Sequence, residues 1–213
     1  MTLSFIMIMD IIGTIAFAIS GAMVAIQRRM DLFGVNILAI TTATGGGVIR
    51  DLIIGQNPPV MFQNPLYVFI AILTANIVFL IVYFSRKYRK NDAHVYALYE
   101  VVLFWCDALG LAAFSVDGVN AGAAAEYERN LFLLVFLGVV TGVGGGVIRD
   151  ILANETPYIF VKHVYASASL LGALLATVLW TYAGQEIAML CGFVTVLSIR
   201  VLARHYKWNL PKL

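Results

Sequence analysis

The amino-acid sequence predicts an all-α integral membrane protein with seven transmembrane helices, arranged as two inverted three-helix repeats and a seventh helix. Of its 213 residues, 61% are hydrophobic and only 12% are charged, about half of the roughly 25% that soluble domains carry. Seven apolar stretches are long enough to cross a bilayer, and one motif of seven residues occurs twice. A soluble domain of this size could not bury so much apolar surface, which excludes soluble enzymes, disulfide scaffolds and coiled coils.

The seven apolar stretches each approach the roughly 20 residues that a transmembrane helix needs. In chain order they are Leu3–Ile26, Leu32–Ile54, Pro65–Phe84, Val95–Val119, Asn130–Ala153, His163–Tyr182 and Glu186–Ala203. The connections between them are short, which leaves no room for a soluble domain. The N-terminus has no basic region and Asp10 interrupts its apolar run, so we expect a transmembrane helix there rather than a signal peptide.

Basic residues outside the apolar stretches orient the protein. An odd number of spans places the two termini on opposite sides of the membrane, which we call the N-side and the C-side. The C-side holds eleven Lys and Arg residues, whereas the N-side connections hold Arg129 alone. The eleven are Arg28, Arg29, Arg86, Lys87, Arg89, Lys90, Lys162, Arg200, Arg204, Lys207 and Lys212. Because basic residues accumulate on the cytoplasmic side, we expect the N-terminus outside and the C-terminus in the cytoplasm.

The chain contains two copies of a three-span unit. The motif Gly45–Asp51 recurs letter for letter as Gly144–Asp150, at an offset of 99 residues. Three upstream pairs match at an offset of 97: Asp10 with Asp107, Phe17 with Phe114, and Gly21 with Gly118. Because three spans are an odd number, the second copy enters the membrane from the opposite side, as in many transporters and channels. We expect the first repeat at residues 1–90, the second at 91–183, and the seventh helix with a cytoplasmic tail at 184–213.

The motif begins with three consecutive glycines near the middle of the membrane. Gly45, Gly46 and Gly47 lie roughly 12 Å below the N-side surface at 1.5 Å per residue, and Gly144, Gly145 and Gly146 lie at a similar depth from the C-side. A single glycine usually indicates close helix packing. Three in a row face three directions, and each weakens a helix by about 1 kcal/mol. We therefore predict broken or kinked helices at both runs, with packing as the alternative.

Charged residues follow each glycine run inside the membrane: Arg50 and Asp51 in the first copy, Arg149 and Asp150 in the second. An arginine at this depth costs a few kcal/mol unless it finds a partner or snorkels to the interface. Adjacent helical residues point about 100° apart, so Asp51 is a poor partner for Arg50. Asp10 and Asp107 lie at matching depths. We predict the ion pairs Asp10–Arg50 and Asp107–Arg149, either as structural braces or as charges that line a pore, with snorkelling as the alternative.

A second repeated element lies late in the first and fourth spans. It comprises Phe17, Ser20 and Gly21 in the first copy, and Phe114, Asp117 and Gly118 in the second. A glycine preceded by an oxygen-bearing side chain would let the helix bend and offer oxygens to an ion, although simple packing is an equal alternative. Thr41, Thr42, Thr44 and Thr141 could also supply oxygens, unless they bond to their own helix carbonyls.

The sequence favours neither an enzyme nor a cofactor-binding protein. It contains no GxSxG, HExxH or P-loop motif, and its three histidines are scattered near span ends. Cys106 and Cys191 lie 85 residues apart in apolar stretches, which predicts packed thiols rather than a structural metal site. No basic run interleaved with aromatics indicates nucleic-acid binding.

Seven spans, an inverted repeat and a GGGxxRD element in the second span of each repeat resemble the trimeric intracellular cation (TRIC) channel family in its prokaryotic branch. The same domain has been described as a glycine-transporter domain. The resemblance covers essentially the whole chain. It implies a homotrimer in the prokaryotic inner membrane, surrounded by lipids, with a pore in each protomer that passes potassium and, less selectively, sodium, without a resident metal. It also implies that Gly45–Gly47 and Gly144–Gly146 form bends beside the pore, as do Gly21 and Gly118.

Two functions remain open at this point. One is a passive cation channel, and the other is a secondary transporter of a small zwitterion such as glycine, because inverted repeats with broken helices serve both. The helix segments after Gly47 and Gly146 could aim their N-termini at the carboxylate of a zwitterion. These segments are short and leave little structure for the conformational change that a carrier needs, so the channel is favoured.

Overall fold

The computed structural model describes residues 5–88, 92–128, 130–161 and 164–208, and these residues are predominantly helical. The helices are α1 (Phe5–Gln27), α2 (Leu32–Ile53), α3 (Val60–Gln63), α4 (Leu66–Tyr88), α5 (Asp92–Ala124), α6 (Leu131–Leu152), α7 (Tyr158–Val161), α8 (Ala166–Ala183) and α9 (Gln185–His205). Seven of them are long and apolar enough to cross a membrane, which confirms the predicted fold class. Some residues named above as span ends or basic residues lie outside the described residues: Leu3, Arg89, Lys90, Arg129, Lys162, His163 and Lys212.

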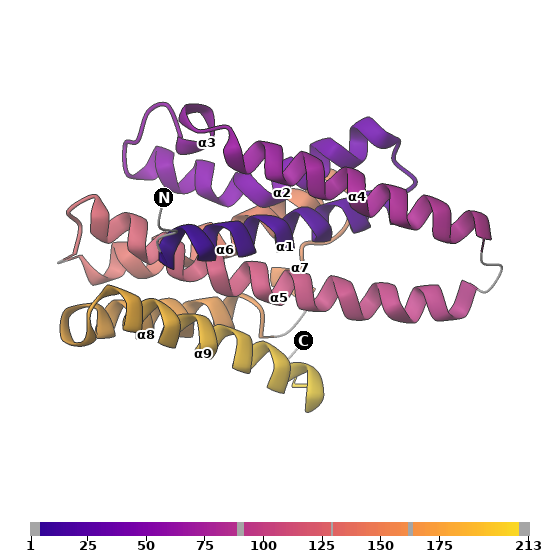
Figure 1. Cartoon of the computed structure of the whole chain (residues 1–213). Helices are drawn as coiled ribbons and strands as arrows, with labels where there is room; N and C mark the ends of the chain where they lie inside the picture. Colours follow the sequence, from indigo (N-terminus) through magenta and orange to yellow (C-terminus); the bar gives the residue numbers. More distant parts are fainter. Residues whose placement is uncertain (1–4, 89–91, 129, 162–163, 209–213) are drawn as a thin grey trace.

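The fourth span differs most from its prediction. Its helix continues to Ala124 rather than ending at Val119, because Asn120 does not end the helix. Asn120 is buried, and its side-chain oxygen accepts a 2.7 Å hydrogen bond from Gln185 at the start of α9. A polar residue with a partner inside the bundle is compatible with continued helix. On the C-side, α4 and α5 extend past the other helices (Figure 1).

Local sequence explains where the second helix of each repeat begins. The side chain of Asp31 caps α2 by accepting a 2.7 Å hydrogen bond from the Gly34 N–H, and Asn130 caps α6 in the same way through Leu133 at 3.1 Å. Short polar side chains at this position satisfy N–H groups that have no partner within the helix. The short helices α3 and α7, which were not predicted, follow α2 and α6 respectively.

The long helices of the two repeats interlock rather than form separate bundles. α1 packs on α2, α4 and α5, while α5 packs on α6, α8 and α9, and α2 packs on α6. Phe17 of α1 and its repeat counterpart Phe114 of α5 meet edge to face, with ring centroids 5.3 Å apart. Equivalent residues can contact each other in this way only near the pseudo-two-fold axis. The seventh helix, α9, covers α5 and α8 from outside the repeats.

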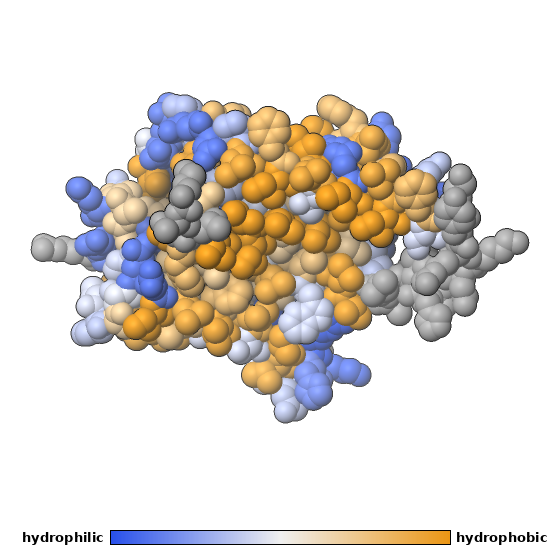
Figure 2. Space-filling model, in the orientation of Figure 1, coloured by the Kyte–Doolittle hydropathy of each residue, from blue (hydrophilic) through white to orange (hydrophobic). Residues whose placement is uncertain are grey.

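The surface matches a protein that spans a bilayer. On the face shown in Figure 2, apolar residues form a continuous band, and the hydrophilic residues gather toward its two ends. Large apolar side chains such as Phe33, Phe69 and Phe132 are mostly exposed on the surface. The interior instead holds small residues and several charged ones, among them Arg149, which is completely buried. The buried charges therefore define the region where function is to be sought.

Candidate functional site

The two glycine runs meet where α2 crosses α6. A Cβ atom on Gly46 would collide with the carbonyl oxygen of Thr141, and one on Gly145 would collide with the carbonyl oxygen of Thr42. Among the outer glycines, a Cβ on Gly45 would meet the flexible end of Ile148 at 2.5 Å, and one on Gly144 would lie 3.1 Å from Cα of Gly46. Gly47 has more room, since the nearest atom to its Cβ would be Nη2 of Arg50, 3.7 Å away. The middle glycine of each run therefore lets two helix backbones touch.

The prediction was a break or a kink at each run, and the break is wrong, whereas the kink stays a prediction. α2 is helical without interruption from Leu32 to Ile53, and α6 from Leu131 to Leu152. Every glycine of both runs lies inside a regular helix, so its backbone groups are satisfied there. The packing alternative applies instead: the absence of side chains permits a close helix contact at membrane depth. The second repeated element behaves likewise, because Gly21 lies against the backbone of Leu38 and Gly118 against that of Leu137.

The threonines beside the glycine runs are bonded to their own helices. The hydroxyl groups of Thr41, Thr42, Thr44 and Thr141 each donate to a backbone carbonyl one turn earlier, at 2.9, 2.5, 2.8 and 2.6 Å. Of the two alternatives predicted from the sequence, bonding to the threonine's own helix therefore applies. Each hydroxyl keeps lone pairs that can still face a ligand.

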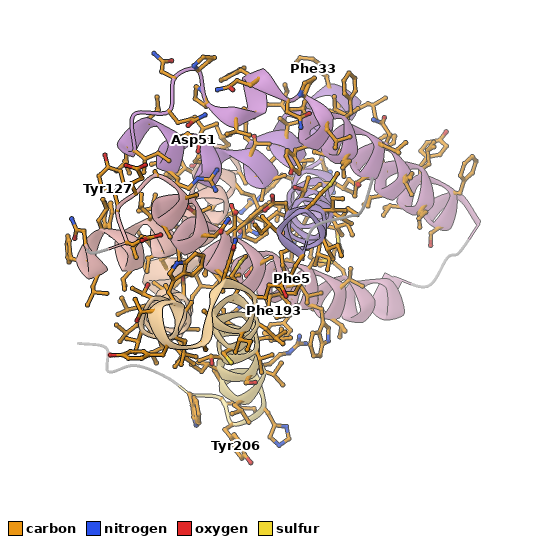
Figure 3. The ribbon with its side chains drawn as sticks, turned by 60° about the vertical axis from the view of Figure 1, so that its left-hand side comes forward. Phe5, Phe33, Asp51, Tyr127, Phe193 and Tyr206 are labelled. Atoms are coloured by element: carbon orange, nitrogen blue, oxygen red, sulfur yellow. The ribbon has the colours of Figure 1, made fainter. Side chains whose placement is uncertain are left out.

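A group of charged and polar side chains, the N-side cluster, is centred on Arg50 at the end of α2. It comprises Asp10, Arg50, Asp51, Tyr67 and Asp117. The guanidinium of Arg50 donates from Nε to Asp51 at 2.9 Å and lies 2.8 Å from it through Nη2, while Nη1 bonds to Asp117 of the other repeat. The second oxygen of Asp51 accepts the N–H of Val60 at 2.8 Å, which ties α3 to the end of α2. Figure 3 shows Asp51 in the interior, whereas Phe33 and Tyr206 lie at the periphery.

The predicted pair Asp10–Arg50 is wrong, and so is the expectation that Asp51 is a poor partner. Asp10 forms no ion pair within 4.0 Å among the described residues; its Oδ2 accepts a 3.2 Å hydrogen bond from the Tyr67 hydroxyl. The matching membrane depths of Asp10 and Arg50 did not show that Asp117 of the other repeat lies closer to Arg50 than Asp10 does. The long arginine side chain also turns back to reach its sequence neighbour, which the direction of the Cβ atoms does not show.

A related group, the C-side cluster, surrounds Arg149 at the end of α6. It comprises Ser20, Asp107, Arg149, Asp150, Tyr165 and Arg200. The predicted pair Asp107–Arg149 is confirmed, at 2.9 Å. Arg149 also bonds to Asp150 through Nε at 2.8 Å and to the Ser20 hydroxyl through Nη1 at 2.5 Å. Asp150 accepts the N–H of Tyr158 at 2.9 Å, as Asp51 accepts that of Val60.

The two clusters follow one plan but carry different charge. Each arginine bonds to the aspartate after it and to a residue of the other repeat, which is Asp117 for Arg50 and Ser20 for Arg149. The N-side cluster has three carboxylates and one guanidinium, a formal net charge of −2. The C-side cluster has two of each, and its formal net charge is zero because Arg200 joins it. The two clusters thus have equivalent positions in the two repeats but different net charges.

The N-side cluster lines a cavity of about 110 Å³. Its wall includes all five residues of the cluster together with Thr14, Thr44, Gly47, Phe114 and Thr141. Oδ1 of Asp10 is buried there without a hydrogen-bond partner. The C-side cluster is closed by comparison, since Arg149, Asp107 and Tyr165 expose no more than 2% of their surface. Among the described residues, no group of acidic, His or Cys side chains is placed to hold a metal ion.

Sequence reasoning did not identify Tyr67, Tyr165 and Arg200 as members of these clusters. The two tyrosines are repeat counterparts, since the Tyr67 hydroxyl donates to Asp10 and that of Tyr165 lies 3.3 Å from Asp107. Their spacing of 98 residues continues the repeat beyond the glycine motif and could have revealed them. Arg200 carried no such signal, because the seventh helix has no counterpart and its basic residues were read as markers of orientation.

Fold and site together define a class: a multi-pass membrane protein whose inverted repeats bring one charged cluster to each side of a helix crossing. The family model described as Glycine transporter matches residues 7–83 and, a second time, residues 104–181. The chain belongs to this family, which is the TRIC channel family and includes solved prokaryotic members.

Similar proteins extend over nearly the whole chain. The inner membrane protein YadS of Escherichia coli (strain K12) is 38% identical over 205 residues, which are 95% of this chain and 93% of YadS. The membrane protein YvgT of Bacillus subtilis is 35% identical over 204 residues, 96% and 94% of the two chains. A structure solved to explain conductance through TRIC cation channels is 35% identical, with a TM-score of 0.82 over 97% of this chain and 96% of that one. The TRIC trimeric intracellular cation channel orthologue from Rhodobacter sphaeroides is 28% identical, with a TM-score of 0.83 over 95% and 98%.

Proposed function

We propose that the protein is a potassium-permeable channel for monovalent cations, with a pore in each protomer of a homotrimer. The observation that carries this proposal is the N-side cavity. Its wall has a formal net charge of −2, and one oxygen of Asp10 is buried in it without a partner. A cavity that carries a net negative charge among transmembrane helices concentrates cations. Rings of carboxylates serve cation channels in this way.

The proposed path leads from the N-side cavity along the crossing of α2 and α6 toward the C-side cluster. Gly47 and Thr141 line the cavity, so its inner end adjoins the glycine runs at Gly45–Gly47 and Gly144–Gly146. Carbonyl oxygens of Thr42 and Thr141 lie against Gly145 and Gly46 at this crossing. In this proposal the two helices shift relative to each other during conduction, because their backbones touch there in the structure described.

Relatives support the remaining parts of the proposal. The similar structures are named as TRIC cation channels, and the orthologue from Rhodobacter sphaeroides is named as trimeric. YadS is named as an inner membrane protein, which supports a place in the prokaryotic cell membrane with lipids against the apolar band. The excess of Lys and Arg on the C-side supports a cytoplasmic C-terminus.

Transport of glycine is the second candidate, because the matching family model carries that description. The cavity holds both charge types that a zwitterion needs, with Arg50 for a carboxylate and Asp10 for an ammonium group. However, Arg50 already bonds to Asp51 and Asp117 through Nε and both Nη atoms. A substrate carboxylate would have to displace one of them. Among the described residues, the one buried oxygen without a partner in the cavity wall belongs to a carboxylate, Asp10, which favours a cation over a zwitterion.

Single-channel recording tests the proposal. The purified protein in planar bilayers is expected to give discrete current steps in symmetric potassium chloride, with a reversal potential near that of potassium under a gradient. Asp117→Asn reduces the formal charge of the cavity from −2 to −1, so we expect its conductance to fall at low salt. The effect is expected to shrink at 1 M salt, where the screening length is about 3 Å.

The matched control is Glu186→Gln, which removes an exposed N-side charge in the first turn of α9, away from the cavity. It is expected to leave conductance unchanged. If the bilayers carry no current and proteoliposomes containing the protein take up glycine, the channel proposal is wrong and the protein is a glycine carrier. A chloride-selective current would contradict the assignment of the cavity to cations.

A further inference from the structure

The seventh helix contributes one charged side chain, Arg200, to the interior of the second repeat. Its Nη2 lies 3.4 Å from Oδ2 of Asp107, and its guanidinium carbon lies 4.8 Å from the ring centre of Tyr165 and 5.3 Å from that of Phe104. Only 6% of Arg200 is exposed. A basic residue near the cytoplasmic end of a span usually serves orientation and reaches toward water. Arg200 instead turns inward to a buried carboxylate.

The N-side cluster shows how the equivalent aspartate is surrounded when no arginine from the seventh helix reaches it. Asp10 is the repeat counterpart of Asp107, and Tyr67 is the counterpart of Tyr165. No cation from another helix bonds to Asp10 among the described residues, and its Oδ1 lies buried at a cavity. At Asp107 both carboxylate oxygens are occupied, Oδ1 by Arg149 and Oδ2 by Arg200. The guanidinium of Arg200 thus occupies, beside Asp107, the place that a mobile cation could occupy beside Asp10.

The contacts of Arg200 differ from those of a permanent structural pair. Its single bond to Asp107 is long, at 3.4 Å, and its buried Nε has no hydrogen-bond partner. Arg149 also has one nitrogen, Nη2, without a hydrogen-bond partner among the described residues, but it donates short bonds to Asp107 at 2.9 Å, to Asp150 at 2.8 Å and to Ser20 at 2.5 Å. Strong arginine–carboxylate pairs use two short, parallel bonds. Arg200 is therefore held mainly by the faces of two aromatic rings and by one weak contact.

We infer that Arg200 is a positioning residue that acts as a tethered cation: it neutralises Asp107 and keeps the C-side half of the conduction path closed. This inference rests on the proposed function, since it concerns the exit of cations that enter at the N-side cavity. With Arg200 in place the C-side cluster is formally neutral and sealed; without it the cluster carries a net charge of −1. A permeating cation and Arg200 compete for the same carboxylate. Conduction requires Arg200 to withdraw.

The decisive variant is Arg200→Gln, which keeps most of the length and hydrogen-bonding capacity of the side chain but removes its charge. We expect the ratio of open to closed time in single-channel records to rise about fivefold or more, within the usual range of coupling between two states. The matched control is Arg204→Gln. Arg204 lies one turn further along α9 and over the same Phe104 ring, at 4.2 Å, but it is exposed and forms no ion pair with a carboxylate among the described residues. Its open-to-closed ratio is expected to stay unchanged.

A chemical measurement tests the same inference without relying on current. Ser20 belongs to the C-side cluster, and its hydroxyl lies 2.5 Å from Nη1 of Arg149. In full-length protein in which Cys106 and Cys191 are replaced by serine, Ser20→Cys introduces a thiol at this position. A small cationic thiol reagent added from the C-side is expected to react about fivefold or more faster when Arg200→Gln is also present. Arg204→Gln in the same background is expected to leave the rate unchanged.

These outcomes separate the inference from the proposed function. If the wild-type protein carries no cation current but Arg200→Gln still accelerates thiol labelling, the channel proposal fails while the closing role of Arg200 stands. If the wild-type protein conducts and Arg200→Gln changes neither the open-to-closed ratio nor the labelling rate, the inference is overturned. Thermal unfolding in detergent accompanies each variant. An equal gain from Arg200→Gln and Arg204→Gln would also overturn the inference, because the effect would then belong to the surface charge of α9.

Discussion

The contact between α2 and α6 makes a specific prediction for neighbouring glycines in one motif. Gly46→Ala places a Cβ atom against the carbonyl oxygen of Thr141, whereas Gly47→Ala places one 3.7 Å from its nearest neighbour, the flexible end of Arg50. A backbone carbonyl inside a helix cannot rotate away, so the two helices have to move apart in Gly46→Ala. The two substitutions are chemically identical and adjacent. Only the helix contact distinguishes them.

The magnitudes follow from two opposing effects. Replacing glycine by alanine in a helix interior stabilises the helix by about 1 kcal/mol, and overpacking costs about 1–3 kcal/mol, with the upper end applying to a backbone obstacle. Gly46→Ala is therefore expected to destabilise the protein by about 2 kcal/mol, whereas Gly47→Ala keeps the gain of about 1 kcal/mol. For a chain of this size, 1 kcal/mol corresponds to about 2–4 °C in melting temperature. We expect a fall of about 4–8 °C for Gly46→Ala and a rise of about 2–4 °C for Gly47→Ala.

Thermal unfolding in a mild detergent, followed by loss of helical circular dichroism, measures both variants. Gly145→Ala is expected to behave like Gly46→Ala, because its Cβ would meet the carbonyl oxygen of Thr42 on the other side of the same crossing. The double variant is expected to lose less than the sum, since helices already separated for one methyl group accommodate the other. Equal melting temperatures for Gly46→Ala and Gly47→Ala would refute the helix contact and return the glycine runs to the role of flexible breaks.

Three further predictions follow from the charged clusters and the charge distribution. Ser20→Ala removes a hydrogen bond to the buried Arg149, so we expect a loss of about 1.5–3 kcal/mol, seen as a lower melting temperature; no change would mean that Arg149 does not depend on Ser20. Removing one member of the Asp107–Arg149 pair leaves a buried charge without its partner and costs about 3–5 kcal/mol of stability. The double variant Asp107→Asn with Arg149→Gln is therefore expected to lose less stability than the sum of the two single variants. Strict additivity of the changes in melting temperature would argue against the pair. In cells expressing protein without its native cysteines, an impermeant thiol reagent is expected to label Asn64→Cys but not Arg29→Cys, and the opposite pattern would reverse the proposed orientation.

Hydropathy and repetition predicted the architecture because both depend on properties that a single chain displays locally. A stretch such as Leu131–Leu152 is apolar enough to span a bilayer whatever surrounds it. The inverted arrangement follows from counting three spans in each copy. The four-residue helices α3 and α7 are too short to leave a periodic pattern. Their positions depend on carboxylates at the ends of α2 and α6 that bond to their first N–H groups.

The partners of the buried charges were harder to predict, because depth in the membrane does not determine which helices face each other. Asp107 and Arg149 belong to the same repeat and lie at matching depths, and that pair is confirmed. The same reasoning was wrong for Arg50, since Asp117 arrives from the other repeat at the same depth. The expected break at the glycine runs was wrong for a related reason. Three consecutive glycines weaken an isolated helix, but contact between α2 and α6 makes the missing side chains an advantage.

Identical motifs in the two repeats therefore do not imply identical roles. The letters from Gly45 to Asp51 and from Gly144 to Asp150 are the same, yet the first arginine borders a cavity and the second is completely buried. The difference comes from residues outside the motif. Arg50 faces a carboxylate from the other repeat where Arg149 faces the Ser20 hydroxyl, and only Arg149 has a second arginine, Arg200, bonded to its aspartate partner. An inverted repeat supplies two equivalent clusters. Residues outside the motif and a helix outside both repeats give the N-side cluster a net negative charge and a cavity, and leave the C-side cluster formally neutral and buried. A channel built on this plan would admit cations at one end and control their exit at the other.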